Sequence, residues 1–345
     1  MKLLNVPDFL LFEGTAVAID VRSPLEFEQG HILGAHSLPL LSNEERAEIG
    51  TLYKKVGKTE AILRGLEIIG PKMREMAEEL IRLSDGKPLF IHCWRGGMRS
   101  QSVAQMAEQL GITSYVLNGG YKAYRQYALE TLSAPIKYQV LSGFTGSGKT
   151  KILQKLEEHG AQVIDLEGFA NHLGSSFGGI GMESQPSTEY FQNMCFTKLH
   201  KMEKNKPIWI EDESANIGHC CLPTGMYQNM QNANWVQIIL PSSERITFIT
   251  EVYGHLPTDQ IKLAIQRIQK RLGPVETKEA LAACDKNNIK RCVEILLQYY
   301  DKLYQKSINK KDIAKGIRLN FEELDFNHIA EELAQLNEKL WIKYD

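Results

Sequence analysis

At residues 138–158 the chain reads YQVLSGFTGSGKTKILQKLEE, so that an apolar strand pattern, a glycine-rich turn and a helical pattern follow one another directly. The turn matches the phosphate-binding loop pattern G-x-x-x-x-G-K-[ST] in the strand-to-helix setting that this pattern requires. Helix N-terminal amides and the lysine ammonium are suited to hold a di- or triphosphate, and the threonine hydroxyl is a candidate Mg²⁺ ligand. A glycine turn without a ligand is the alternative. The predicted phosphate-binding residues are Gly143, Gly146, Ser147, Gly148, Lys149 and Thr150.

Acidic side chains are expected opposite this loop, where neighbouring strands of the same sheet end. The apolar run Pro207–Ile210 leads into Glu211-Asp212-Glu213, and Asp165 follows the strand-like run Ala161–Ile164. We predict Asp212 and Asp165 as candidate acids on the metal side of the phosphate, although the pattern does not show which acid faces the metal. Solvated strand ends are the alternative.

Strand and helix patterns alternate on both sides of the break at Ser133-Ala134-Pro135, which indicates parallel α/β structure throughout. A chain of 345 residues is long for one core, so we predict two domains, residues 1–134 and residues 135–345. The fold class is therefore a parallel-sheet α/β domain followed by a P-loop NTPase-like α/β domain with a basic C-terminal segment. Further expected strands are Ala16–Val21, Leu89–His92, Ser114–Leu117 and Trp235–Leu240, and expected helices are Lys72–Leu83, Phe191–Glu203, Asp259–Leu272 and Ile289–Tyr300.

Composition excludes several classes of protein. Lys and Arg number 40 against 42 Asp and Glu, so the formal net charge of −2 gives no global positive field that would attract nucleic acid. No apolar run is long enough for a membrane span, and we expect a cytoplasmic protein without membrane partners. Six cysteines without a CxxC pair predict neither a disulfide framework nor a zinc site.

A second strand-to-helix turn carries chemistry in the first domain. Residues 92–100 read HCWRGGMRS, which places Cys93 over the unpaired amides of the following helix, where a thiolate is favoured. Gly96 and Gly97 let the backbone curl around an anion, and Arg95 and Arg99 add positive charge, so we predict Cys93, Arg95 and Arg99 as catalytic residues. An inert buried cysteine is the alternative. The Cys-x5-Arg spacing also fits cysteine phosphatases, so the loop leaves phosphoryl and chalcogen transfer open.

Residues 19–39 read IDVRSPLEFEQGHILGAHSLP, and together with Cys93 this stretch resembles the signature of rhodanese-like sulfurtransferases. The resemblance implies that the cysteine carries sulfur or selenium, with Asp20, Arg22, Gly96 and Gly97 supporting its loop. The whole chain resembles the bacterial tRNA 2-selenouridine synthases, in which a rhodanese domain is joined to a P-loop domain. Departures from that family are Leu173 and Thr188, which affect local ligand contacts. The segments that carry the resemblance are ERAEIGTLYKKVG (45–57), GGYKAYR (119–125), DLEG (165–168), NHLGSSFG (171–178), EDES (211–214) and YYD (299–301).

This resemblance implies that selenium from selenophosphate replaces the sulfur of wobble 2-thiouridine in tRNA, through an S-geranylated intermediate made from geranyl diphosphate. A selenophosphate-producing enzyme would be a second partner. The rivals are a rhodanese-fold cysteine phosphatase, a thiosulfate sulfurtransferase with a regulatory nucleotide-binding P-loop domain, and a nonenzymatic RNA-binding module. The basic stretch 302–318 otherwise reads as a solvated face. Candidate tRNA contacts are Lys54, Lys55, Trp94, Lys306, Lys310 and Lys311.

Overall fold

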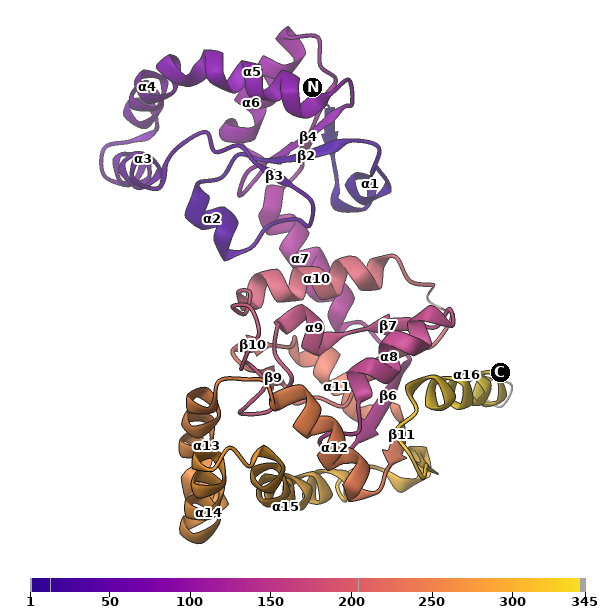
Figure 1. The fold of residues 1–345 in the computed structure, drawn as a ribbon. Helices are drawn as coiled ribbons and strands as arrows, with labels where there is room; N and C mark the ends of the chain where they lie inside the picture. The colour runs from indigo at the N-terminus through magenta and orange to yellow at the C-terminus, as the bar shows by residue number, and fades with distance from the viewer. Residues whose placement is uncertain (1, 13, 204, 342–345) are drawn as a thin grey trace. The chain divides into compact units, whose positions relative to one another are not determined.

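The structure is a computed structural model that describes residues 2–12, 14–203 and 205–341. The chain divides into two compact units, each built on one parallel sheet (Figure 1). The first unit consists of residues 1–131 with residues 192–197, and the second consists of residues 132–191 with residues 198–345. Both units are α/β, which confirms the predicted fold class.

The sheet of the first unit has the strand order β1-β5-β4-β2-β3, with every pair parallel. The central strand β4 is buried at all four positions, as parallel strands covered on both faces usually are. Because β4 ends at His92, the turn that carries Cys93 lies at the carboxyl edge of the sheet, where α/β sheets bind ligands. The strands are β1 Lys2–Leu4, β2 Val17–Asp20, β3 His36–Ser37, β4 Leu89–His92 and β5 Ser114–Leu117.

The helices of the first unit begin where the sequence supplies caps. Ser23 and Glu26 form a capping box at the start of α2, and Ser42 and Glu45 form another at the start of α3. The main core packs α5 and α6 against the sheet, with Leu80, Ile91 and Val103 almost fully buried. The helices are α1 Val6–Leu11, α2 Pro24–Gln29, α3 Asn43–Lys55, α4 Lys58–Ile69, η1 Gly70–Lys72, α5 Met73–Ser84, α6 Met98–Gln109 and α7 Gly120–Ser133.

The sheet of the second unit has the strand order β12-β11-β6-β8-β7, again with every pair parallel. All six residues of the central strand β6 are buried, and this strand runs directly into the phosphate loop. The chain passes from β8 on one side of β6 to β11 on the other, so the loop lies where the strand order changes direction. The strands are β6 Tyr138–Gly143, β7 Gln162–Ile164, β8 Ile208–Glu211, β11 Asn234–Ile239 and β12 Gly316–Asn320, with a hairpin of β9 Asn216–Ile217 and β10 Cys220–Cys221.

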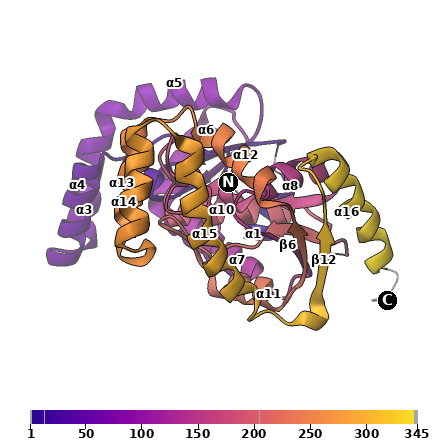
Figure 2. The same cartoon turned by 60° about the horizontal axis from the view of Figure 1, so that its bottom comes forward.

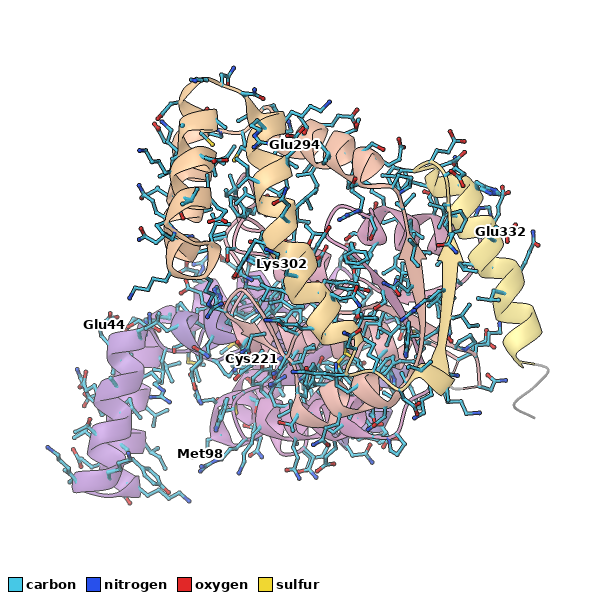
Figure 3. All side chains as sticks on the ribbon, turned by 90° about the horizontal axis from the view of Figure 1, so that it is seen from below. Glu44, Met98, Cys221, Glu294, Lys302 and Glu332 are labelled. Atoms are coloured by element: carbon cyan, nitrogen blue, oxygen red, sulfur yellow. The ribbon has the colours of Figure 1, made fainter. Side chains whose placement is uncertain are left out.

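Helices of the second unit form two apolar clusters. One packs α8 and α16 with the sheet, and the other joins α13, α14 and α15, which lie side by side (Figure 2). Lys302 on α15 and Glu332 on α16 are exposed (Figure 3). The helices are α8 Lys149–Glu158, α9 Leu166–Ala170, α10 Thr188–His200, α11 Thr224–Asn232, α12 Ser242–Tyr253, α13 Thr258–Leu272, α14 Pro274–Asp285, α15 Ile289–Ile308, η2 Ile313–Lys315 and α16 Phe326–Trp341.

Several elements of the second unit were not expected from the sequence, and three of them are informative. The helix expected to end at Tyr300 continues to Ile308, so much of the basic stretch is helical. The remainder of that stretch contains η2 and the start of β12, an edge strand that pairs with β11. The helix α14 was not expected, because its buried side chains are small, among them Ala280 and Ala283, and give a weak apolar periodicity. No helix in the described ranges has both the length and the apolar content needed to cross a bilayer.

Candidate functional site

The cysteine loop joins β4 to α6 through residues 93–97. Gly96 has φ of 67°, and a Cβ atom there would collide with the carbonyl oxygen of Leu117. The loop is also closed by the start of α7, because the backbone amide of Tyr121 donates to the Cys93 carbonyl at 2.9 Å and that of Lys122 donates to the Trp94 carbonyl at 3.0 Å. The predicted turn is therefore fixed by contacts with a helix that begins 27 residues after the cysteine.

Cys93 is buried, with 3% of its surface exposed, and its Sγ lies 3.3 Å from the hydroxyl of Ser100 in the first turn of α6. Burial raises the pKa of the Cys93 thiol, but hydrogen bonds from Ser100 and the Arg95 amide, with the charge of Arg99, outweigh it. The net pKa of Cys93 is lower than that of an ordinary thiol. This shift increases the thiolate fraction, which is the nucleophilic form.

The two predicted arginines have different surroundings. Arg95 is exposed, whereas the guanidinium of Arg99 donates to the Glu26 carboxylate at 2.9 Å. Burial raises the pKa of Glu26, but the hydrogen bond from Arg99 and the charge of Arg99 have a larger effect in the opposite direction. The net pKa of Glu26 is therefore below its usual value, and Glu26 stays ionised. Sequence reasoning missed Glu26, because its place in the Ser23-x-x-Glu26 capping box explains it without any second role.

A buried ion pair between Asp20 and Arg22 lies beside Tyr121, the residue whose backbone amide bonds to Cys93. Arg22 donates to the Asp20 carboxylate at 2.6 Å and to the Gly30 carbonyl at 2.6 Å, and its guanidinium lies 3.7 Å from the ring centroid of Tyr121. Both charged residues are almost fully buried. The sequence also missed Gly120, where a Cβ atom would collide with the carbonyl oxygen of Cys93.

The phosphate loop joins β6 to α8. Gly146 and Gly148 have φ of 83° and 69°, and side chains there would collide with Ile249 and with the ring of Phe326. Lys149 Nζ donates to the carbonyl of Gly143 at 3.2 Å, which folds the ammonium back over the loop. The glycine pattern thus produces the open amide turn that phosphate binding needs.

The acids around this loop are arranged differently from the simplest expectation. Thr150 Oγ1 donates to the Glu167 carboxylate at 2.6 Å, so Glu167 is the acid nearest the threonine. Asp165 caps α9 by accepting from the Gly168 amide at 2.7 Å. Asp212 accepts from Lys311 at 2.7 Å and from the hydroxyl of Ser142. Asp165 and Asp212 both line the same cavity as Lys149, and their roles as acids stay predictions.

Two further carboxyl groups near the loop have raised pKa values. Burial raises the pKa of Glu211 well above its usual range, with the charge of Asp165 adding to the effect. Burial and the charge of Glu167 raise the pKa of Glu213 to about 8. No group of three or more His, Cys, Asp or Glu residues in the described ranges is arranged to hold a metal ion, and Mg²⁺ at Thr150 stays a prediction.

A cavity of about 490 Å³ opens beside the phosphate loop, a size within the range of roughly 300–1,000 Å³ typical of small-molecule sites. One part of its lining is polar and includes Lys149, Thr150 and Glu167. The other part is largely apolar. It consists of Leu173, Met182, Phe248, Ile249, Val252 and Tyr253. The cavity therefore suits a ligand with one phosphorylated end and one apolar end.

The candidate tRNA contacts fall into three groups. Lys54 and Lys55 at the end of α3 are exposed, as are Lys306 and Lys310. Trp94 is half-buried, and its ring centroid lies 5.9 Å from that of Tyr121. Lys311 does not lie on a solvated face, because its side chain is only 8% exposed and forms the ion pair with Asp212. The sequence could not predict that ion pair, because the two residues lie 99 positions apart.

These two sites define an enzyme that joins a rhodanese-like cysteine loop to a P-loop domain. The chain matches the model of the rhodanese-like domain over residues 10–127 and that of the tRNA 2-selenouridine synthase AAA domain over residues 136–334. Proteins named tRNA 2-selenouridine synthase from Shewanella woodyi and Aeromonas salmonicida are 32% and 33% identical to it. Both matches span 85% of this chain, and they span 88% and 87% of the two relatives. One from Nitrosomonas europaea is 36% identical over 79% of this chain and 72% of its own.

The chain belongs to the tRNA 2-selenouridine synthase family. It is therefore a tRNA-modifying enzyme of the transferase type, and the resemblance inferred from the sequence segments is confirmed.

Proposed function

We propose that this enzyme replaces the sulfur of wobble 2-thiouridine in tRNA by selenium from selenophosphate, through an S-geranylated intermediate made from geranyl diphosphate. The names of the relatives support the conversion of a tRNA uridine to 2-selenouridine. The two co-substrates and the intermediate rest on the chemistry of the two sites.

The observation that carries the proposal is the apolar wall beside the phosphate loop. A diphosphate held by Lys149 and the loop amides leaves its ester group facing the cavity that Phe248 and Val252 line. A nucleotide would place a ribose and a base there, which need polar partners, whereas a prenyl chain is stabilised by removal from water. The mixed lining therefore favours a prenyl diphosphate over a nucleoside triphosphate.

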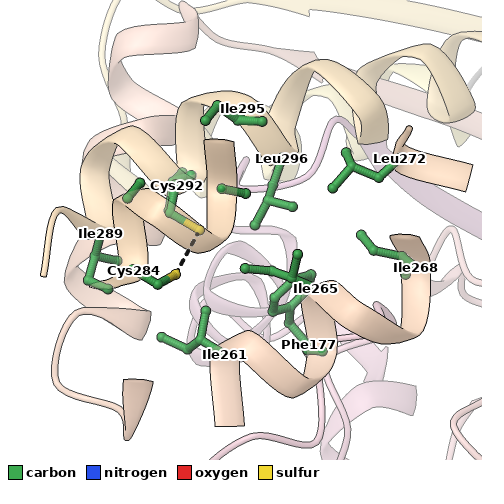
Figure 4. Close-up of a cluster of buried hydrophobic side chains, with 14 of the residues drawn as sticks. Phe177, Ile261, Ile265, Ile268, Leu272, Cys284, Ile289, Cys292, Ile295 and Leu296 are labelled. Atoms are coloured by element: carbon green, nitrogen blue, oxygen red, sulfur yellow. Dashed lines mark hydrogen bonds between the residues drawn. The ribbon is translucent and has the colours of Figure 1, made fainter. Parts of the chain in front are cut away.

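A second, smaller cavity extends the apolar region. It has a volume of about 50 Å³ and shares Ile249 and Tyr253 with the larger cavity. Its other walls include Ile261 and Leu296 in the cluster formed by α13, α14 and α15 (Figure 4). The far end of a prenyl chain can be accommodated against this cluster. Helices α13, α14 and α15, which lie outside the phosphate-loop motif, would then contribute to the selection of prenyl chain length.

The two proposed steps are chemically complementary. In the first, the thiocarbonyl sulfur displaces diphosphate from the geranyl carbon, and the N3 proton of the base is lost. In the second, a selenium nucleophile attacks C2 of the base, and the geranyl thiolate leaves. Alkylation makes the sulfur a better leaving group, which explains why the prenyl step precedes the selenium step.

The cysteine loop supplies the chalcogen chemistry of the second step. The lowered pKa of Cys93 favours a thiolate, which is the nucleophilic form of the side chain. A phosphatase would need the arginine of its Cys-x5-Arg loop to bind the substrate phosphate. Arg99 is instead held by Glu26 at 2.9 Å, and its charge helps to lower the pKa of Cys93. The names of the relatives favour chalcogen transfer over the phosphatase alternative.

The tRNA is proposed to present its wobble base from the single-stranded anticodon loop, where bases can be turned out of the stack. Exposed Lys54, Lys55, Lys306 and Lys310 are suited to contact flanking phosphates. An enzyme that produces selenophosphate remains a proposed second partner.

Nucleoside mass spectrometry tests the proposal directly. The enzyme is incubated with tRNA that contains 2-thiouridine and with geranyl diphosphate, selenophosphate or both. Geranyl diphosphate alone should give the S-geranylated nucleoside, and both together should give 2-selenouridine. Thiocyanate formation from thiosulfate and cyanide without any nucleoside change would instead support a simple sulfurtransferase.

A further inference from the structure

A polar cavity of about 470 Å³ lies next to the phosphate-loop cavity, and Met182 lines both. Its lining differs in character, because amide, imidazole and guanidinium groups make up a larger share of it than polar groups do in the phosphate-loop cavity. These groups belong to Asn171, His172, Gln185, His219, Gln260 and Arg267. Such donors and acceptors are suited to a nucleobase and its flanking phosphates rather than to a prenyl chain.

A short turn after α9 contributes to both cavities. Asn171 and His172 line the polar cavity, and the next two residues, Leu173 and Gly174, line the phosphate-loop cavity. The turn is fixed by left-handed conformations at Asn171 (φ 48°) and Gly174 (φ 69°). It is also fixed by a hydrogen bond of 3.1 Å from the His172 amide to the Glu167 carbonyl. A base in one cavity and a prenyl diphosphate in the other would meet at this turn.

His172 presents an unused polar atom at this place. Its Nδ1 is buried, and no described residue lies within hydrogen-bonding distance of it. Two other polar residues of the cavity are held by the protein. Gln185 bonds to the carbonyls of Ala170 and Ile217 and to the His219 amide, and His219 Nε2 lies 3.0 Å from the Pro186 carbonyl. The imidazole of His172 also lines the cavity, but its Nδ1 is not engaged by any described residue.

The ionisation of His172 suits a proton acceptor. Burial lowers its pKa, the charge of Glu167 raises it, and a charged His219 nearby lowers it, with a net pKa below that of an ordinary histidine. The remaining charged groups that line the cavity are Glu183 and Arg267. A neutral imidazole is the form that can accept a proton.

We propose that the polar cavity binds the 2-thiouracil base and that the imidazole of His172 accepts the N3 proton when the thiocarbonyl sulfur is alkylated. The electrons of the C=S π bond form the new bond from sulfur to the geranyl carbon. The carbon–oxygen bond breaks, and its electrons leave with diphosphate. The N3–H electrons become the N3=C2 π bond as the proton moves to His172. This inference rests on the proposed geranylation.

The test is single-turnover geranylation of 2-thiouridine tRNA by His172→Ala and His172→Gln. Both variants should slow the chemical step by about 10²- to 10⁴-fold, the usual contribution of a general base, with unchanged affinities for tRNA and geranyl diphosphate. Added imidazole should restore part of the rate of His172→Ala only. His255→Ala, at an exposed histidine on the same unit, is the matched control and should react like the wild type.

The possible outcomes separate this inference from the proposed function. If the wild type forms no geranylated nucleoside, the proposed function fails. If the wild type reacts and both His172 variants react within threefold of it, only the assignment of the base fails. Selenium transfer to tRNA that is already geranylated should be unaffected by either variant, which excludes a general loss of folding.

A second experiment tests the cavity itself. Gln260→Trp on α13 places a large side chain in the polar cavity, and it should raise the KM for tRNA about tenfold while the affinity for geranyl diphosphate is kept. Gln269→Trp, exposed on the same helix and outside the cavity, is the control. An unchanged KM for tRNA in Gln260→Trp would overturn the location of the base.

Discussion

The cysteine loop and the phosphate loop start from the same local design. Each is a glycine-rich turn between the central strand of a parallel sheet and a helix, with one or two glycines at positive φ. In the first loop, the start of α7 closes over the backbone and Cys93 is buried. In the second, the turn borders a cavity of about 490 Å³. The comparison shows that neighbours distant in sequence decide whether such a turn is closed over or borders a cavity.

The charged residues around the two loops also differ in their surroundings. Arg99 near Cys93 is paired with Glu26, and its charge helps to lower the pKa of the Cys93 thiol. Lys149 lines the same cavity as Glu167 and Glu213, and burial together with the charge of Glu167 raises the pKa of Glu213 to about 8. A diphosphate would bring further negative charge, so the lysine and the loop amides have to compensate for it.

The strongest test of this contrast is Cys93→Ala. We expect selenium incorporation to fall by about 10³-fold or more, because removing a nucleophile is among the most costly changes in an active site. Geranylation and tRNA binding should be retained. Nucleoside mass spectrometry on reactions with and without selenophosphate measures both products, and equal loss of both would contradict the division of labour between the loops.

Lys149→Ala should affect the other step. Loss of one charged hydrogen bond, about 1.5–3 kcal/mol, should weaken binding of geranyl diphosphate by roughly 10- to 100-fold. Isothermal titration with geranyl diphosphate measures this change, and Lys155→Ala on the outer side of α8 is the control. Selenium transfer to tRNA that is already geranylated should not change. Unaltered binding would show that the phosphate loop does not hold the prenyl donor.

Gly120→Ala tests the closure of the cysteine loop by α7. The residue has φ of 61°, and its Cβ atom would collide with the Cys93 carbonyl, so we expect a loss of about 1–3 kcal/mol in the free energy of unfolding. Gly97→Ala, in the same loop but with open space around it, should cost less than about 1 kcal/mol. Denaturant unfolding compares the two, and similar losses would contradict the proposed closure.

The smallest effect is expected for Ser100→Ala. Since the hydrogen bond from Ser100 lowers the pKa of Cys93, its removal should raise that pKa and move the alkylation profile of Cys93 to higher pH. At neutral pH the thiolate fraction and the alkylation rate should therefore fall. Peptide mass spectrometry after iodoacetamide treatment separates Cys93 from the exposed Cys221, and Ser102→Ala is the control on the same helix. An unchanged profile would assign the lowered pKa to the loop backbone and the charge of Arg99.

The fold class was predictable because both sheets are parallel and their strands read as short apolar runs between helices. Elements with weak periodicity were not, and α14 and β12 are the examples. Among the site residues, contiguous motifs identified Cys93 and the phosphate loop, because consecutive residues fix the turn. Glu26, Gly120 and Glu167 were missed as parts of a site, since each can be explained locally as a cap, a turn or an exposed acid.

The sequence by itself determined the two strand-to-helix turns, the candidate nucleophile, the phosphate-loop motif and the family. Local backbone conformation and the chemistry of adjacent side chains depend on neighbouring residues, which the sequence shows directly. Only the tertiary structure decided that Arg99 pairs with Glu26, that Lys311 pairs with Asp212 and that His172 faces a polar cavity. These contacts depend on the packing of segments far apart in the chain, and that packing sets which side chains are free to act.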